Sequence, residues 1–119
     1  DLWVKRKDGR FTNEEAGTLL SSKKLILQDI LHLKNRGEIQ GQAGILLTGT
    51  HLENENHISS LTGNIELSLN SAENKETGFI GTSQNLRVDI DNQLNNQGHI
   101  RGGKATFKVR EFSNEGTIR

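Results

Sequence analysis

The sequence predicts an all-β fold, a parallel β-helix (solenoid) of about six turns of about 20 residues each, with residues 1–119 as a single repeat segment. Three observations lead to this prediction. A short motif recurs at nearly constant spacing, apolar and polar residues alternate between its copies, and no stretch keeps the roughly 3.6-residue period of a helix. The hydrophobic content of 31% is low for a globular core but is enough for a thin coil, whose turns are stabilised by stacking on their neighbours.

The motif places an apolar residue, an asparagine, a glycine and a second apolar residue at intervals of two, as in "LKNRGEI" at 33–39 and "LNNQGHI" at 94–100. Its asparagine recurs at Asn13, Asn35, Asn54, Asn74, Asn96 and Asn114, and the closing apolar residue at Leu19, Ile39, Ile58, Ile80, Ile100 and Ile118. The residue two before each asparagine is Phe11, Leu33, Leu52, Ala72, Leu94 or Phe112. In a parallel β-helix equivalent residues of successive turns stack about 4.8 Å apart, so each set is predicted to form one column, and stacked asparagine amides can hydrogen-bond along theirs.

The glycine of the motif is Gly37, Gly98 and Gly116, and Asn56 replaces it in the third copy. Glycine and asparagine tolerate positive φ better than other residues, so this position is predicted to be a left-handed turn residue. Two copies, at 13–19 and 74–80, carry two extra residues between asparagine and glycine. Because side chains of a strand alternate with a period of two, such insertions keep the following residues in phase.

A second apolar alternation lies between consecutive motifs and predicts a further strand in each repeat. Its apolar positions are Leu25 and Leu27; Ile45 and Leu47; Ile65, Leu67 and Leu69; Leu86, Val88 and Ile90; and Ala105, Phe107 and Val109. We expect essentially no helix. An antiparallel sandwich also uses short strands but has no reason to repeat its sequence, and a leucine-rich repeat requires several fixed leucines before its asparagine.

The composition bears on several functional classes. The chain has 15 lysine and arginine residues and 15 aspartate and glutamate residues. It therefore lacks the net positive charge that would favour binding to nucleic acid. The absence of cysteine excludes disulfides and cysteine-based zinc sites. No apolar run approaches the roughly 20 residues that cross a bilayer, and no signal peptide opens the chain. Both ends interrupt repeat-like sequence, so we expect a segment excised from a longer rod, with exposed edges that favour end-to-end self-association.

Few residues are candidates for chemistry. Asp89 and Asp91 share one face of a predicted strand, either as the acid–base pair of a polysaccharide lyase or hydrolase or as a solvated face that pairs with Lys108 and Arg110. Two of the four histidines occupy equivalent motif positions two turns apart, about 10 Å, which is too far to share a metal. The four are His32, His51, His57 and His99, of which the last two form this pair. We expect no catalytic, cofactor or metal site.

The basic stretch near the N-terminus is a candidate contact surface. Lys5, Arg6 and Lys7 would attract a sulfated glycan or an acidic partner surface. Trp3, the only tryptophan, is either a recognition residue or part of the core of an incomplete first turn.

The apolar-x-Asn-x-Gly-x-Ile motif at a period near 20, followed by glycine and serine, resembles the haemagglutinin repeats of large secreted Gram-negative exoproteins. These include filamentous haemagglutinin-like adhesins and contact-dependent growth inhibition exoproteins of the two-partner secretion type. The resemblance covers the chain from about Phe11 to Arg119, and it is close at "LNNQGHIRGG". The copies at 13–19 and 74–80 depart from the pattern by their two inserted residues.

The resemblance implies a right-handed β-helical shaft that is exported through an outer-membrane two-partner-secretion transporter to the bacterial surface. It also implies a virulence-related role in cell adhesion, in which the segment extends the protein or contacts a receptor or glycan on a host or target cell. It carries over no catalytic residue. The alternative is a β-helical carbohydrate-active enzyme domain, but the turns vary in length by only a few residues and no acidic cluster converges, so we expect no enzyme.

Overall fold

The structure is a computed structural model, and it describes residues 2–4 and 9–119. Strands make up 72% of it, and the described residues contain no helix. The strands are parallel and stack as a β-solenoid of about six turns, each about 20 residues long. The predicted fold class is therefore confirmed.

The described residues form thirteen strands. They are β1 (Leu2–Val4), β2 (Arg10–Asn13), β3 (Thr18–Ser21), β4 (Leu25–Asn35), β5 (Glu38–Gly41), β6 (Ile45–Asn54), β7 (His57–Ser60), β8 (Ile65–Asn74), β9 (Phe79–Thr82), β10 (Asn85–Asn96), β11 (His99–Arg101), β12 (Lys104–Asn114) and β13 (Thr117–Ile118). The long strands carry the second alternation and the first half of the motif, and the short strands begin directly after the glycine position. Each repeat thus contributes one strand of each kind.

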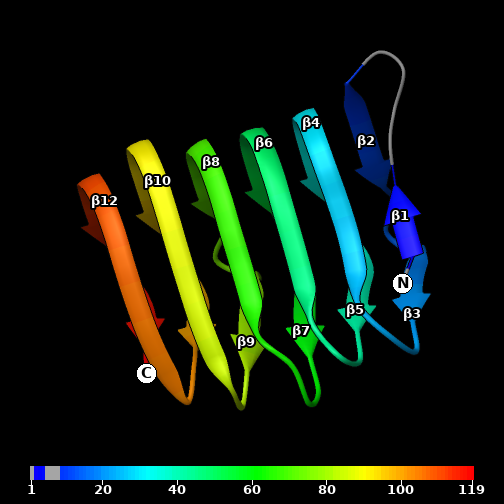
Figure 1. Ribbon diagram of the computed structural model, residues 1–119. Coiled ribbons are helices and arrows are strands. Elements are labelled where there is room, and N and C mark those ends of the chain that lie inside the picture. Colours follow the sequence, from blue (N-terminus) through cyan, green and yellow to red (C-terminus); the bar gives the residue numbers. More distant parts are fainter. Residues whose placement is uncertain (1, 5–8) are drawn as a thin grey trace.

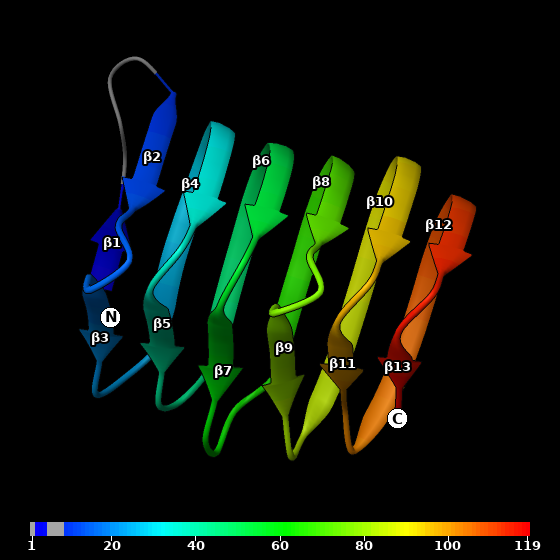
Figure 2. The ribbon, with the colours of Figure 1, turned by 180° about the vertical axis from the view of Figure 1, so that it is seen from behind.

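The strands form two sheets (Figure 1). Sheet A has the order β1-β4-β6-β8-β10-β12, with β2 also paired to β4, and sheet B has the order β13-β11-β9-β7-β5-β3. In Figure 1 the chain rises along each long strand on the near side, crosses to the far side at the top, descends there and returns one turn nearer the C-terminus, so the coil is right-handed. Figure 2 shows the same coil from behind, with the short strands of sheet B in front.

The register places equivalent motif residues directly opposite one another. In sheet B, Ile39 pairs with Leu19 and Ile58, and the column continues through the other closing residues to Ile118. In sheet A, Leu33 pairs with Phe11 and Leu52, and that column runs on to Phe112. The inner members of both columns are almost fully buried and form one core with the apolar residues of the second alternation. Burial of these side chains is the main stabilising term, at about 25 cal/mol per Å² of apolar surface.

Each long strand bends part-way along its length, where the pairing becomes irregular. In β4 one extra residue is accommodated between Leu27 and Ile30, and Asp29 there has a φ of 56°. Its backbone N–H donates to the hydroxyl of Thr48 at 3.1 Å. A Cβ on Gly49 of β6 would collide with the carbonyl of Ile30, so this close approach of two backbones requires glycine.

Candidate functional site

The most regular polar feature of the molecule is a column of buried asparagines at the end of each long strand. Every side-chain amide donates an N–H to the Oδ1 of the asparagine one turn later, at distances of 2.8 to 2.9 Å. The donors in order are Asn13, Asn35, Asn54, Asn74 and Asn96, and the last acceptor is Asn114. All five bonds point the same way along the coil. The column, which we call the asparagine ladder, joins every turn to the next.

Each ladder amide also fixes its own turn. Asn35, for example, donates to the backbone oxygen of His57 at 3.1 Å, and its Oδ1 accepts the N–H of Gly37 at 3.2 Å. Asn96 makes the equivalent bonds to Thr117 and Gly98. A buried amide costs little when its donors and acceptors are satisfied, and neighbouring bonds in such a network strengthen one another. The ladder therefore defines the turn geometry while it links the turns.

The prediction of a left-handed glycine in the motif is wrong. Among the described residues, positive φ occurs only at Gly9, Asp29 and Gly44. Gly37 is required for a different reason, because a Cβ there would collide with the carbonyls of Gly17 and Glu14 in the turn stacked before it. Gly98 and Gly116 likewise lie against carbonyl oxygens of the preceding turn. The glycine permits close stacking of turns and not an unusual φ.

Asn56 replaces glycine where the preceding turn is short. Its side-chain amide donates to the carbonyl of Arg36 in that turn at 3.2 Å. Gly37 and Gly98 follow the copies with two inserted residues. In those copies Gly17 and Gly78 close tight turns, because the backbone N–H of each donates to the carbonyl three residues earlier. The inserted turns keep the strands in phase, as predicted, since Ile80 pairs with Ile58.

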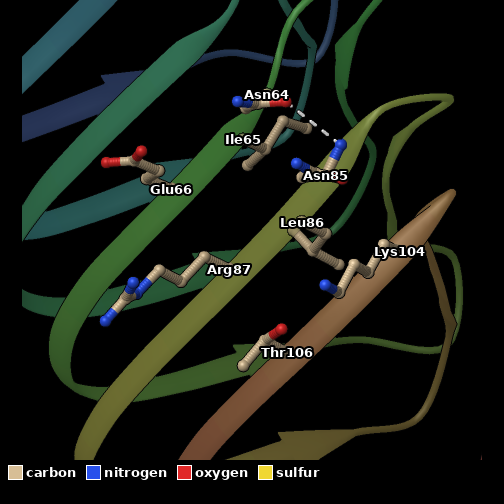
Figure 3. Close-up of a pocket in the computed structure, with 8 residues that line it drawn as sticks. All are labelled: Asn64, Ile65, Glu66, Asn85, Leu86, Arg87, Lys104 and Thr106. Atoms are coloured by element: carbon tan, nitrogen blue, oxygen red, sulfur yellow. Dashed lines mark hydrogen bonds between the residues drawn. The ribbon is translucent and has the colours of Figure 1, made fainter.

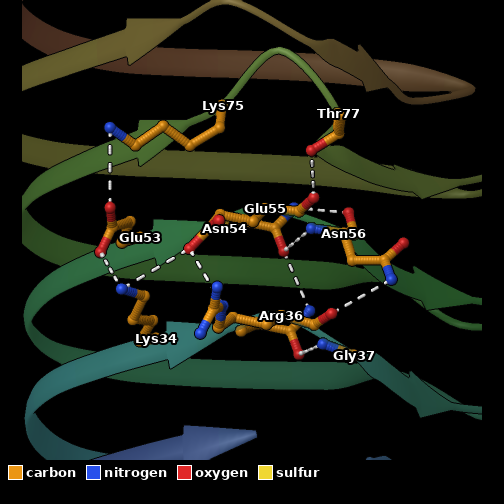
Figure 4. A network of polar contacts seen from close by, with 10 residues as sticks. Lys34, Arg36, Gly37, Glu53, Asn54, Glu55, Asn56, Lys75 and Thr77 are labelled. Atoms are coloured by element: carbon orange, nitrogen blue, oxygen red, sulfur yellow. Dashed lines mark hydrogen bonds and ion pairs between the residues drawn. The ribbon is translucent and has the colours of Figure 1, made fainter. Parts of the chain in front are cut away.

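A second polar cluster lies at the ends of β4, β6 and β8 and on the turns that follow them (Figure 4). Lys75 contacts Glu73 at 2.8 Å and Glu53 at 3.6 Å, and these two glutamates are paired in register on neighbouring strands. Lys34 reaches Glu53 and Glu55 at 3.8 and 3.6 Å, and Arg36 reaches Glu55 at 3.7 Å. The cations thus offset the repulsion between stacked carboxylates. This charge network links three turns.

The contact between Lys75 and Glu73 shifts the pKa values of both groups. The hydrogen bond from Lys75 lowers the pKa of Glu73 below its ordinary value, although partial burial opposes this, and the positive charge of Lys75 adds to the lowering. The same bond raises the pKa of Lys75, with the charge of Glu73 acting in the same direction. Both groups are therefore ionised at neutral pH.

Asp89 and Asp91, which the sequence offered for acid–base chemistry, both lie on β10. Asp89 lies in register between Ser68 and Lys108, but no ion pair to Lys108 forms, so the expected charge pairing is wrong; Asp91 falls where the pairing of β10 becomes irregular. No group of three or more histidine, aspartate or glutamate side chains that could hold a metal occurs within residues 2–4 and 9–119.

The histidines form two local arrangements. His57 and His99 share one column, as the sequence indicated, with Phe79 between them. His32 and His51 are direct neighbours, with ring centroids 5.1 Å apart, and Nδ1 of His51 lies 2.7 Å from the hydroxyl of Ser71. Sequence reasoning missed this second pair, although the step of 19 residues between the two histidines is the step between Asn35 and Asn54.

A shallow pocket of about 220 Å³ lies on the outer face of sheet A (Figure 3). Its rim combines Glu66 with Arg87 and Lys104, and at one end the N–H of Asn85 donates to the side chain of Asn64 at 3.1 Å. Because both signs of charge line it, the pocket favours neither an anion nor a cation.

The proposed N-terminal contact residues Lys5, Arg6 and Lys7 lie outside the described residues. Trp3 is 56% exposed and pairs in register with Ile26 on the outer side of sheet A, so it is not a core residue. Within the described ranges, no helix is long and apolar enough to cross a membrane. No protein-family model, curated protein or solved structure matches the chain.

Proposed function

We propose that this chain is a structural and adhesive segment of a large filamentous protein, exported by an outer-membrane two-partner-secretion transporter to the surface of a Gram-negative bacterium. The asparagine ladder is the observation that carries the proposal. A stack whose every turn offers the same edge to the next can be lengthened turn by turn without a change of architecture. The likeness of the motif to haemagglutinin repeats supports the same class of protein.

The adhesive part of the proposal rests on the contrast between inner and outer positions. The inner column of sheet B is uniform, with isoleucine in every turn but the first. The outer position next to it changes in every turn, through Thr18, Glu38, His57, Phe79, His99 and Thr117. Residues that point away from a solenoid core are free to vary, which makes its outer faces suitable for recognition.

The adhesive role is tested by the binding of the fluorescently labelled chain to bacterial and epithelial cells. Far-UV circular dichroism first establishes that the chain is folded. We expect saturable binding to one cell type that unlabelled chain displaces. A folded chain that shows no saturable binding to either cell type would overturn the adhesive role.

The structural role needs a separate experiment. The chain is inserted between the secretion-signal region and a surface reporter of a two-partner exoprotein, and is co-expressed with that exoprotein's transporter. We expect export equal to that of a control insert of the exoprotein's own repeats. Retention of the reporter in the periplasm, with the control insert exported, would contradict the proposal.

A further inference from the structure

The outer face of sheet B, in front in Figure 2, carries a groove of about 320 Å³. Four successive short strands, β5, β7, β9 and β11, line it. Gln40 comes from β5, Ser59 from β7 and Arg101 from β11, and these positions are aligned in register through Gly81 of β9. Leu61, which is 59% exposed, closes one side.

An aromatic pair forms one wall of the groove. The rings of His57 and Phe79 stack with their centroids 4.7 Å apart and their planes 15° apart. The phenyl ring extends over Gly81, where any Cβ would collide with it. Because His57 covers the face of the phenyl ring toward β7, the other face is turned toward β11, where His99 and Arg101 are in register with Phe79 and Gly81. No second ring stacks on it among the described residues.

The groove is positively charged. Arg101 is exposed and has no ion-pair partner in the described part of the chain, and no aspartate or glutamate lines the groove. Glu38 of β5 is in register with His57, but its side chain does not line the groove. A planar guanidinium without a partner is suited to bidentate pairing with a carboxylate. The groove therefore combines an aromatic face, an anion-binding group and the polar side chains of Gln40 and Ser59.

We propose that this groove binds a carboxylate-bearing saccharide, with Arg101 pairing with the sugar carboxylate, the open face of Phe79 packing against the C–H face of the sugar ring, and Gln40 and Ser59 bonding to its hydroxyls. Pockets of this size typically pair apolar walls with a few convergent polar groups. An acidic peptide fits less well, since peptides that bind sheets pair with an unpaired strand edge. Here β7, β9 and β11 each have a strand on both sides. The inference rests on the adhesive role and names its ligand chemistry.

The test titrates the isotope-labelled chain with tri-galacturonate and with sialyllactose and follows the backbone amide signals by NMR. Methyl-esterified tri-galacturonate and lactose are the uncharged probes, and a short glutamate-rich peptide is the acidic non-sugar probe. We expect saturable shifts at Ser59, Gly81 and Arg101 with one or both acidic sugars and much weaker shifts with the other probes. Failure of both acidic sugars, or equal binding of the peptide or the uncharged sugars, would overturn the proposal.

Variants locate the site. Arg101→Gln is expected to weaken sugar binding by about tenfold or more, because a charge-assisted bond is lost. Phe79→Leu should weaken it too, through loss of the stacking face. Arg87→Gln on sheet A is the matched control and should leave the affinity unchanged. If Arg101→Gln and Arg87→Gln weakened sugar binding equally, the binding site would not be this groove. Cell binding that persists in Arg101→Gln would reject this groove while leaving the adhesive role intact.

Discussion

Asn54 donates its side-chain N–H to Oδ1 of Asn74 across 2.9 Å, and the exposed fractions of these two residues are 0% and 1%. The same amide group donates to the backbone oxygens of Asn56 and Phe79 at 3.0 and 3.2 Å. One buried side chain thus closes its own turn and holds the next one in register. Removing such a group leaves several buried donors and acceptors without partners. The resulting loss of stability is larger than the net stabilisation from any single hydrogen bond.

The first prediction compares neighbouring asparagines in β10. Asn96→Ala removes a ladder member that bonds to Asn114, Gly98 and Thr117, so we expect the free energy of unfolding to fall by about 2–4 kcal/mol. Asn95→Ala is the control, because the buried Oδ1 of Asn95 has no hydrogen-bond partner. This second change should alter stability by no more than about 0.5 kcal/mol. Urea unfolding measures both, and equal losses would contradict the role of the ladder.

The second prediction concerns close stacking of the turns. Gly37→Ala places a methyl group against the carbonyls of Gly17 and Glu14, so the turn must shift, and we expect a loss of about 2–4 kcal/mol. Asn56→Ala at the equivalent position removes only an exposed bond to Arg36 and should cost under about 1 kcal/mol. Thermal unfolding of the two variants tests the comparison. A milder effect at Gly37 than at Asn56 would show that the glycine is not required for stacking.

The third prediction is a pH dependence of stability. The pKa of Glu73 is lowered, so its stabilising contribution is present above the ordinary value of 4.5 and is lost as pH falls through the lowered value. The pKa of Lys75 is raised, so its contribution is present below 10.5 and is lost as pH rises through the raised value. Between these limits the pair stabilises the fold by under about 1 kcal/mol, because both side chains are partly exposed and solvent screens them.

The test of this pH dependence compares Glu73→Gln with the parent chain by urea unfolding across the acid range. The variant should be less stable at neutral pH, and the difference should vanish as the parent carboxylate becomes protonated. Glu66→Gln is the control, since Glu66 has no ion-pair partner among the described residues. A stability difference for Glu73→Gln that persists in strong acid would contradict the assignment to this ion pair.

The fourth prediction is end-to-end association. The last strand of sheet A, β12, exposes Phe112, which is 41% accessible, and Asn114 accepts the final ladder bond without donating to another described residue. At the opposite end Leu2 is 37% exposed at an inner position, in register with Leu25. The two ends of the coil therefore offer complementary hydrogen-bonding and apolar groups. These favour the stacking of a second copy of the chain on the end of the first. Sedimentation velocity should show association that increases with concentration.

Two variants separate the end of the coil from its sides. Phe112→Lys should reduce the association, because a charge would be buried in the stacked contact. Leu61→Lys changes an apolar residue on the lateral face that is more exposed than Phe112, and it should have no effect on the association. Particles that remain monomeric at all concentrations would refute end-to-end stacking.

Sequence reasoning reached the columns because two simple periods determine them. A step of about 20 residues brings Leu33 to Leu52, and the alternation of a strand places both inside. The role of Gly37 was out of reach, since it depends on the inserted turn at Gly17 stacking directly before it. The charge network was missed for a similar reason, because Lys75 lies in the turn after β8 and reaches Glu53 on the neighbouring strand β6.

The groove of sheet B shows the same limit. The sequence places His57 and Phe79 in one column, but it does not tell which way a phenyl ring turns. That direction follows from the missing side chain at Gly81, two residues further along the same strand. The extra residue at Asp29 was equally hidden, since a single added residue in β4 lies within the variation in length between successive repeats.

The measurement that tests the central claim most directly is hydrogen exchange of the asparagine side-chain amides, followed by NMR. We expect the ladder amides of Asn35, Asn54 and Asn74 to exchange only through opening of the stack, orders of magnitude more slowly than the exposed side chain of Asn92. Exchange of the three ladder amides at the rate of Asn92 would show that no such ladder holds the turns together.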